Sequence, residues 1–152
     1  VDALPEPPEA QLIYLTQTTL SIDETRHLVE RLKERFPRLE DPPTSDICYA
    51  TQNRQDAVKA LARDADTILV VGSETSSNSR SLRAVARAHG ARAFLVPGPE
   101  GIDDAMLEGA RVVGVTAGAS APEDVVQAVV DALRRRGATS VEERIVVEEE
   151  ME

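Results

Sequence analysis

Short runs of almost entirely apolar residues alternate with stretches of helical periodicity along most of this sequence, and this alternation limits the fold more than any other feature. The apolar runs lie at residues 67–72, 91–98 and 111–118, and the helical stretches at 53–65, 81–90, 100–109 and 120–137. Since the runs are apolar at nearly every position, both faces of each strand should be buried, as in a parallel sheet. We therefore predict an α/β fold, a doubly wound three-layer sandwich with a mainly parallel sheet.

Three regions are expected along the chain. Residues 1–10 are rich in proline and acid and should form a flexible leader. Residues 11–46 contain one strand-like run, one helical stretch and a proline-rich connector. Residues 47–152 should form the α/β lobe, which closes with a strand at 141–147 before an acidic tail.

The helix in the second region should begin near Ile22, because Ser21 and Glu24 have the spacing of a capping box. Its predicted buried face consists of Leu28, Val29, Leu32 and Phe36. The strand before it, from Gln11, lacks an obvious partner. We expect it either to add to the edge of the main sheet or to pair with a second copy of the chain, giving a homodimer.

Charge and composition exclude several classes of partner. The formal net charge is −10 and only 3% of residues are aromatic, which disfavours binding to nucleic acid or to an anionic membrane surface. There is no apolar run long enough to span a membrane. The single cysteine excludes an internal disulfide and fits a reducing, cytoplasmic setting.

Ligands of parallel α/β sheets bind beyond the carboxyl ends of the strands, so the loops that follow the strands indicate function. These loops read QTT at 17–19, SETSSNS at 73–79 and TAGAS at 116–120. They supply hydroxyl groups, two side-chain amides and glycines but no lysine. With the backbone N–H groups and dipoles of the following helices, they are suited to bind a phosphate or diphosphate.

Each polar residue in these loops also has a purely structural interpretation. Ser120 and Glu123 form another S-x-x-E box, so Ser120 could cap the helix that follows. Ser79 or Asn78 could cap the helix that follows them in the chain, and Thr18 or Thr19 could satisfy the backbone of a turn. The string Ser76–Ser77–Asn78 is harder to explain in this way, because one cap needs only one side chain.

Cys48 lies just before a predicted helix, where the helix dipole stabilises a thiolate that could serve as a metal ligand or a nucleophile. The alternative is an inert buried thiol. His27 and His89 fall in helices rather than in strand-end loops, so neither supports a Cys–His pair. A Cys48-dependent transferase or hydrolase is therefore a weaker hypothesis.

Four motifs occur in one order with nearly regular spacing: QTTLS at 17–21, DICYATQNRQ at 46–55, VVGS followed by SSNS within 70–79, and GVTAGASAP at 114–122. Together they resemble the C-terminal half of the LytB-type iron–sulfur enzymes, the hydroxymethylbutenyl diphosphate reductases of non-mevalonate isoprenoid biosynthesis. The resemblance implies one lobe of a three-lobed fold, plus a strand–helix piece of the preceding lobe. It also implies an oxidoreductase that removes water from an allylic alcohol diphosphate with two electrons, yielding isopentenyl and dimethylallyl diphosphates.

The resemblance assigns roles to individual residues. Cys48 corresponds to one of three cysteines that hold a 4Fe-4S cluster, and Thr18 is expected beside the substrate hydroxyl in a catalytic role. The diphosphate ligands would be Ser76, Ser77, Asn78 and Ser120. Gln17 and Thr51 are expected to contact these groups rather than the substrate itself. Ferredoxin or flavodoxin is the electron donor that the family implies.

Two departures from the family pattern alter these expectations. Thr75 and Ser81 replace an Asn and an Arg of the family, which implies changed loop contacts. The family's first half, with two further cluster cysteines, substrate-binding histidines and a proton-donating Glu, has no counterpart in these 152 residues. We therefore expect this polypeptide alone to lack reductase activity and to need the missing N-terminal half as a partner. The alternative is a non-catalytic diphosphate-binding or interaction module of the same ancestry.

Overall fold

The computed structural model describes residues 4–5, 12–15, 22–41 and 49–144. The elements in these ranges are β1 (Leu12–Ile13), α1 (Ile22–Arg35), β2 (Leu39–Glu40), α2 (Tyr49–Asp64), β3 (Thr67–Val71), α3 (Ser77–Ala88), β4 (Arg92–Val96), the 3₁₀ turn η1 (Pro99–Gly101), α4 (Asp104–Leu107), β5 (Val113–Ala117) and α5 (Glu123–Arg135).

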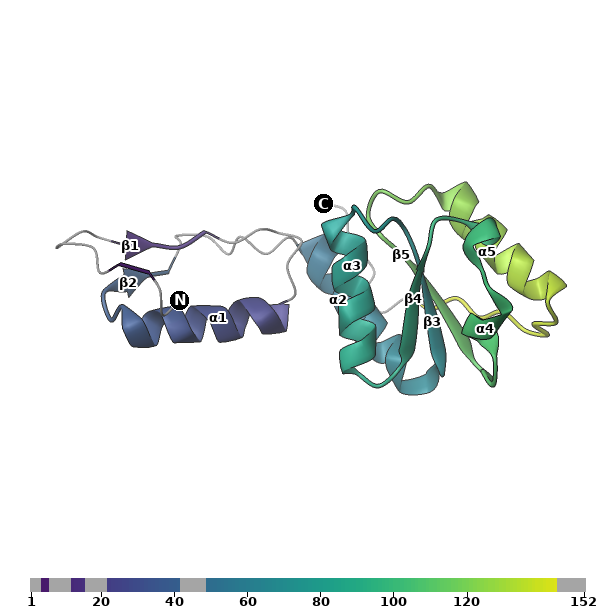
Figure 1. Cartoon of the computed structure of the whole chain (residues 1–152), viewed down its shortest axis with the longest axis horizontal. Coiled ribbons are helices and arrows are strands. Elements are labelled where there is room, and N and C mark those ends of the chain that lie inside the picture. The colour runs from purple at the N-terminus through teal and green to yellow at the C-terminus, as the bar shows by residue number, and fades with distance from the viewer. Residues whose placement is uncertain (1–3, 6–11, 16–21, 42–48, 145–152) are drawn as a thin grey trace.

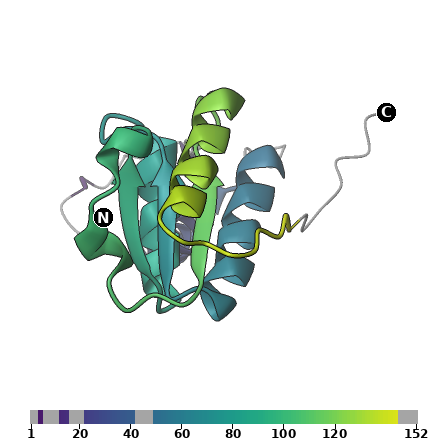
Figure 2. The same cartoon turned by 90° about the vertical axis from the view of Figure 1, so that its right-hand side faces the viewer.

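A parallel three-stranded sheet in the order β4-β3-β5 forms the middle layer of the larger body. Helices α2 and α3 cover one face, and α5 covers the other together with η1 and α4 (Figure 1). Figure 2 looks onto the α5 face. The predicted α/β class, with helices on both faces of a parallel sheet, is thus confirmed.

The central strand β3 explains why the apolar runs lack a polar face. Its side chains alternate between the two helical layers: Ile68 and Val70 pack with α2 and α3, whereas Leu69 and Val71 pack with α5. All five residues of β3 are buried. Because no face of this strand meets water, alternation between apolar and polar residues is not needed.

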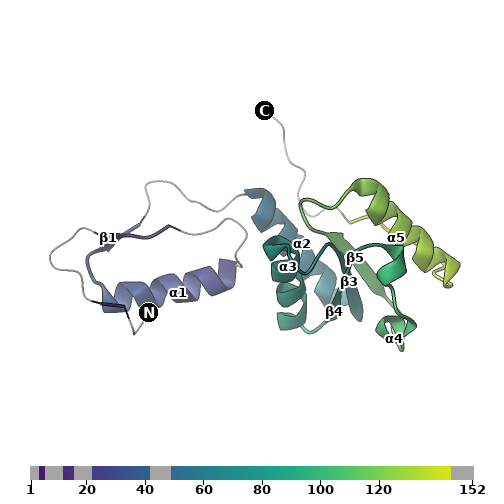
Figure 3. The same cartoon turned by 45° about the horizontal axis from the view of Figure 1, so that its top comes forward.

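The amino-terminal elements form a separate arrangement. Strand β1 pairs in parallel with β2 in a two-stranded sheet, with Leu12 opposite Leu39 and Ile13 opposite Glu40. Figures 1 and 3 show these strands beside α1, away from the three-stranded sheet. The expectation that the strand from Gln11 adds to the edge of the main sheet is therefore wrong. Its partner within the described residues is β2, which lies in the segment that the sequence predicted to be a proline-rich connector.

Helix α1 begins at Ile22 as predicted, but its predicted buried face is only partly correct. Leu28 is 55% exposed, whereas Val29, Leu32 and Phe36 are half-buried. The capping residue Ser21 lies outside the described residues.

Several helix boundaries differ from those predicted. Helix α2 starts four residues before the predicted residue 53, and α3 starts at Ser77 rather than Ser81. The single helix predicted at 100–109 is divided into η1 and α4, because the Asp103 side chain caps α4 by accepting the Ala105 N–H. Residues 141–144 are not a strand, and the rest of that predicted strand lies outside the described residues.

Asp66 joins two turns at the amino-terminal ends of the strands in the three-stranded sheet. Its carboxylate accepts the backbone N–H groups of Arg111 at 2.8 Å and Val112 at 3.0 Å, which join the turn before β3 to the turn before β5. These two hydrogen bonds, that from Val112 first, lower the pKa of Asp66 below its ordinary value of 3.8.

We predict that Asp66→Ala lowers the free energy of unfolding at neutral pH and that this deficit shrinks in acid. A carboxyl group with a lowered folded-state pKa contributes stability above its unfolded-state pKa, and that contribution is lost as the pH falls through the folded-state value. Urea unfolding of both proteins at neutral pH and well below pH 3.8 tests this. A deficit that is the same at both pH values would contradict it.

Candidate functional site

The carboxyl ends of β3 and β5 meet at a topological switch point. After β3 the chain crosses to α3 on one face of the sheet, and after β5 it crosses to α5 on the other. The two strand ends remain joined, because the Gly118 N–H donates to the Val71 carbonyl at 3.0 Å. Open α/β sheets bind ligands between two loops that diverge in this way, so we call the region between residues 72–79 and 118–122 the crevice.

The loop after β3 presents the start of α3 to this crevice. Ser76 is the N-cap of α3, in an extended conformation (φ −82°, ψ 114°), and its hydroxyl oxygen accepts the Ser79 N–H at 3.3 Å. Thus Ser76 performs the capping that the sequence had assigned to Ser79 or Asn78. This cap explains why the helix starts four residues before its predicted start.

The first turns of the helices differ in charge. Helix α3 has no acidic residue in its first turn, whereas α5 begins with Glu123 and Asp124. Carboxylates there already compensate the positive end of the α5 dipole, while the α3 dipole remains available to an external anion. An anion in the crevice is therefore favoured beside α3.

Asn78, in the first turn of α3, has an unsatisfied buried amide. Its side chain is 7% exposed, and neither Oδ1 nor Nδ2 has a hydrogen-bond partner within the described residues. Nδ2 lies 3.8 Å from the point where a Cβ on Gly118 would stand, so the amide faces the loop after β5. Buried polar groups are normally satisfied, and an exception calls for a missing partner such as a ligand.

Two glycines bring the strand ends against the first turn of α3. A Cβ on Gly72 or on Gly118 would overlap Ser79 Oγ. Ser79 itself is 1% exposed, so it has little room to move away. The absence of side chains at these two positions therefore lets the two loops close on α3.

Ser120 is not a helix cap. Helix α5 starts at Glu123, its N-cap residue is Pro122, and no side chain caps it. The Ser120 side chain is exposed, in the turn closed by the Ala121 N–H donating to the Gly118 carbonyl at 3.0 Å. The capping interpretation of Ser120 is therefore wrong, and its hydroxyl is available to a ligand beside the crevice.

We predict that Ser120→Ala changes the free energy of unfolding by less than about 0.5 kcal/mol, because an exposed side chain without a capping bond is lost. Loss of a true N-cap would instead cost about 1 kcal/mol. Urea unfolding measures the difference, with Ser76→Ala as the comparison in which the cap is removed. Equal losses in the two variants would show that Ser120 does cap α5.

The remaining predicted site residues lie at the same edge or outside the described residues. Ser77 is exposed, and Arg80 Nη2 donates to its hydroxyl at 3.4 Å. Thr51 is buried in the first turn of α2, which packs beside α3. Gln17, Thr18 and Cys48 lie outside the described residues.

The two positions that depart from the family pattern have local partners. Thr75 Oγ1 and Ser73 Oγ share a hydrogen bond of 2.8 Å, and Ser81 Oγ accepts from Gln55 Nε2 at 3.4 Å. In the same loop, Glu74 forms an ion pair with Arg83. These contacts do not involve the side chains of Asn78 or Ser120, and a change in the loop relative to the family stays a prediction.

An iron–sulfur cluster does not fit the side chains that are described. No group of three or more His, Cys, Asp or Glu residues capable of holding a metal occurs among them. The one cysteine of the sequence, Cys48, lies outside them. Because clusters of this type are held by several thiolates, this chain cannot complete such a site with its own residues.

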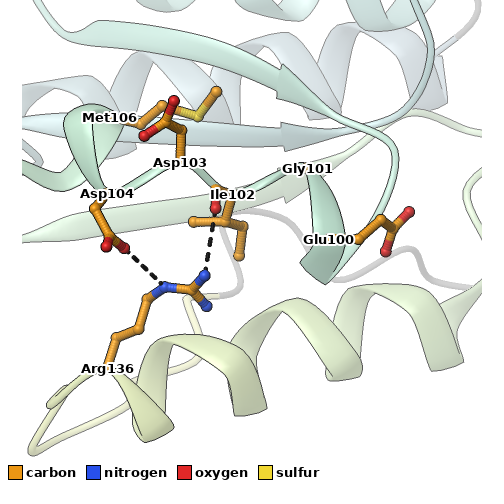
Figure 4. A pocket seen from close by; sticks show the side chains of 7 residues that line it. All are labelled: Glu100, Gly101, Ile102, Asp103, Asp104, Met106 and Arg136. Carbon is orange, nitrogen blue, oxygen red and sulfur yellow. Dashed lines mark hydrogen bonds and ion pairs between the residues drawn. The ribbon is translucent and has the colours of Figure 1, made fainter.

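A hollow of about 520 Å³ lies between α4 and the end of α5 (Figure 4). Glu100, Asp103 and Asp104 line it, opposed by Arg136, which bonds to Asp104 Oδ1 and to the Ile102 carbonyl at 3.3 Å each. Because carboxylates dominate its lining, this hollow would repel a diphosphate, and it lies beside α4 rather than at the start of α3. We therefore assign the candidate site to the crevice between Ser76–Asn78 and Gly118–Ser120.

Sequence reasoning identified the hydroxyls and the amide of the crevice but missed the residues that hold them in place. Ser79, Gly72 and Gly118 were not among the predicted site residues. The three-residue spacing between Ser76 and Ser79, one helical turn, is the signal that could have drawn attention to their contact.

Comparisons with known proteins identify one family of relatives. The sequence matches the family described as LytB protein over residues 1–134. It is 51% identical to the 4-hydroxy-3-methylbut-2-enyl diphosphate reductase of Rhodopirellula baltica, over all of this chain and 48% of that protein. The reductase of Bordetella pertussis is 55% identical over 93% of this chain and 43% of its own length.

A solved structure of the corresponding reductase from Plasmodium falciparum superposes with a TM-score of 0.82 and 37% identity, over 87% of this chain and 42% of that one. The chain thus spans less than half the length of the relatives it matches. Among the described residues, no helix has the length and apolar character needed to cross a membrane.

Proposed function

This chain belongs to the LytB protein family, and from that membership we propose that it forms the diphosphate-binding, C-terminal part of a 4-hydroxy-3-methylbut-2-enyl diphosphate reductase. The buried, unpartnered amide of Asn78 is the observation that carries this proposal. A diphosphate oxygen would accept a hydrogen bond from Nδ2 and relieve the cost of burying that group.

The site would bind the diphosphate with neutral donors. The hydroxyls of Ser76, Ser77 and Ser120 flank the Asn78 amide, and the positive end of the α3 dipole adds favourable potential. Each hydrogen bond contributes about 0.5–1.5 kcal/mol, or about 1.5–3 kcal/mol where it is made to a charged group. Affinity would therefore come from several donors held in one geometry.

In the complete enzyme the allylic alcohol would lose its hydroxyl as water on uptake of two electrons and two protons, leaving isopentenyl and dimethylallyl diphosphates. A 4Fe-4S cluster would supply the electrons, received from ferredoxin or flavodoxin. We propose Cys48 as the one cluster ligand from this chain, Thr18 as the hydroxyl beside the substrate alcohol, and Gln17 and Thr51 as supporting groups. The other thiolates must come from outside these 152 residues.

Calorimetric titration of the 152-residue chain with pyrophosphate tests the binding role directly. We expect binding by the wild type and a loss of affinity in Ser77→Ala and in Ser120→Ala. Acetate, a singly charged anion without a phosphoryl group, serves as the control ligand. Absence of pyrophosphate binding by folded chain would contradict the proposed function.

The catalytic role needs a second experiment, in which the chain is mixed with the N-terminal half of a relative and the cluster is reconstituted without oxygen. We expect reductase activity in the mixture and none in either half. A well-folded, cluster-loaded mixture that makes no dimethylallyl diphosphate would exclude catalysis by such an assembly.

The single cysteine of the sequence favours a second candidate function, a diphosphate-binding module without redox chemistry. It would bind pyrophosphate like the first candidate but would stay free of iron and inactive after mixing.

The location of the protein in the cytoplasm and its association as a homodimer stay predictions. Light scattering measures the latter, and a monodisperse monomer would contradict it.

A further inference from the structure

Ser79 occupies the centre of the candidate site without being one of its proposed ligands. It is 1% exposed and packs against the backbone of Gly72 at the end of β3 and of Gly118 at the end of β5. Its hydroxyl donates a hydrogen bond to Ser76 Oγ over 3.1 Å. One buried side chain therefore touches both strand ends and the helix cap.

The hydrogen bonds of Ser76 Oγ determine where its own proton can point. A serine hydroxyl has one donor and two acceptor positions. Ser76 Oγ accepts from the Ser79 N–H at 3.3 Å and from the Ser79 O–H at 3.1 Å. With both acceptor positions filled from the protein side, the Ser76 O–H is left to donate, away from Ser79 and toward the crevice.

We propose that Ser79 is a positioning residue, which fixes the Ser76 hydroxyl as an obligatory donor to an unprotonated diphosphate oxygen. The proposal rests on the proposed function, since it specifies how that same site selects its ligand. A ligand that presents an O–H or N–H group at this point meets no free acceptor on Ser76. A bare phosphoryl oxygen meets a donor that is already oriented.

The close packing around Ser79 strengthens this constraint. The backbones of Gly72 and Gly118 pack closely against Ser79, which is 1% exposed, so its hydroxyl is shielded from bulk water. Without the Ser79 hydroxyl, Ser76 Oγ would have a vacant acceptor position and its proton could turn inward. Part of the binding energy would then be spent on reorienting Ser76.

The test is a double-mutant cycle on pyrophosphate affinity, measured by calorimetry with the 152-residue chain. We expect Ser76→Ala to weaken binding about tenfold and Ser79→Ala about fivefold, since each removes or misdirects one hydrogen bond to a charged group. In the Ser76→Ala background, Ser79→Ala should cause almost no further loss, because it acts through Ser76. Ser140→Ala, a change of an exposed serine outside both loops, is the matched control and should bind as the wild type does.

A second readout does not depend on a ligand. The NMR couplings between the Ser76 hydroxyl proton and its two Hβ protons report rotation about the Cβ–Oγ bond, and this hydroxyl should occupy one rotamer in the wild type and several in Ser79→Ala. Circular dichroism of each variant verifies that the fold is retained. Rotamer averaging together with non-additive affinities would support the proposal, whereas a residue that only fills space would leave the Ser76 hydroxyl in one rotamer.

A failure of the positioning role of Ser79 can be distinguished from a failure of the proposed function. If the wild type binds pyrophosphate and Ser79→Ala binds equally well, or if its loss adds fully to that of Ser76→Ala, the positioning role is wrong and the proposed function stands. If the folded wild type binds no pyrophosphate, the proposed function fails and the role of Ser79 fails with it.

Discussion

Asn78→Leu is expected to weaken pyrophosphate binding about 100-fold while raising the free energy of unfolding of the unliganded chain by about 1 kcal/mol. The two effects have opposite signs because the buried amide has no partner within the described residues until an anion arrives. Leucine has nearly the shape of asparagine, so it removes the cost of the unsatisfied polar atoms without leaving a large cavity. It also removes a donor that the ligand needs.

Urea unfolding without ligand and calorimetric titration with pyrophosphate measure the two effects on the same samples. Gln127→Leu provides the matched control, since Gln127 is an exposed amide on α5 that is bonded to Asp131. It should leave the affinity unchanged. A marked loss of stability in unliganded Asn78→Leu would show that the amide already has a partner, and unchanged affinity would remove Asn78 from the site.

Gly118→Ala is expected to destabilise the fold by about 1–3 kcal/mol, and Ser79→Ala should suppress most of that loss. The added methyl group would overlap Ser79 Oγ but would stand 3.6 Å from Ser79 Cβ, which is an ordinary contact. Removing the hydroxyl oxygen therefore removes the clash. The double variant should be more stable than Gly118→Ala alone, although each single change is damaging or neutral.

Gly72→Ala offers a matched comparison for this suppression. A Cβ on Gly72 would stand only 2.8 Å from Ser79 Cβ, an atom that alanine retains, so Ser79→Ala should not rescue it. Thermal or urea unfolding of the three single and two double variants decides the question. Equal rescue of both glycine variants, or rescue of neither, would contradict the packing of Ser79 between the two strand ends.

The layered architecture was predictable because burial on both faces leaves a direct trace in the sequence. In β3, Ile68 and Leu69 face opposite helical layers, and both must be apolar. No knowledge of distant partners is needed to recognise such a strand. The order of strands and helices along the chain was predictable for the same reason.

Local capping was harder to predict, because one motif can be satisfied by several residues. The spacing of Ser120 and Glu123 matches a capping box, yet α5 begins at Glu123, directly after Pro122, without a side-chain cap. Conversely, Ser76 caps α3 in a string where several neighbours had the right chemistry. The backbone conformation of the loop makes that choice, and the sequence does not display it.

Contacts between segments distant in the chain account for the remaining differences. The unsatisfied amide of Asn78 and the packing of Ser79 against Gly118 exist only because the loops after β3 and β5 meet. The parallel pairing of β1 with β2 likewise joins two short segments on either side of α1. A linear motif identifies the members of such a site, but the geometry that links them comes from the fold.

Titration of ¹⁵N-labelled chain with pyrophosphate, followed by NMR, tests the central claim most directly. The account predicts that saturable shifts concentrate in the amides of residues 72–79 and 118–122, the two loops that form the crevice. Saturable shifts that concentrate instead around Glu100–Met106, or no saturable shifts at all in a well-dispersed spectrum, would contradict it.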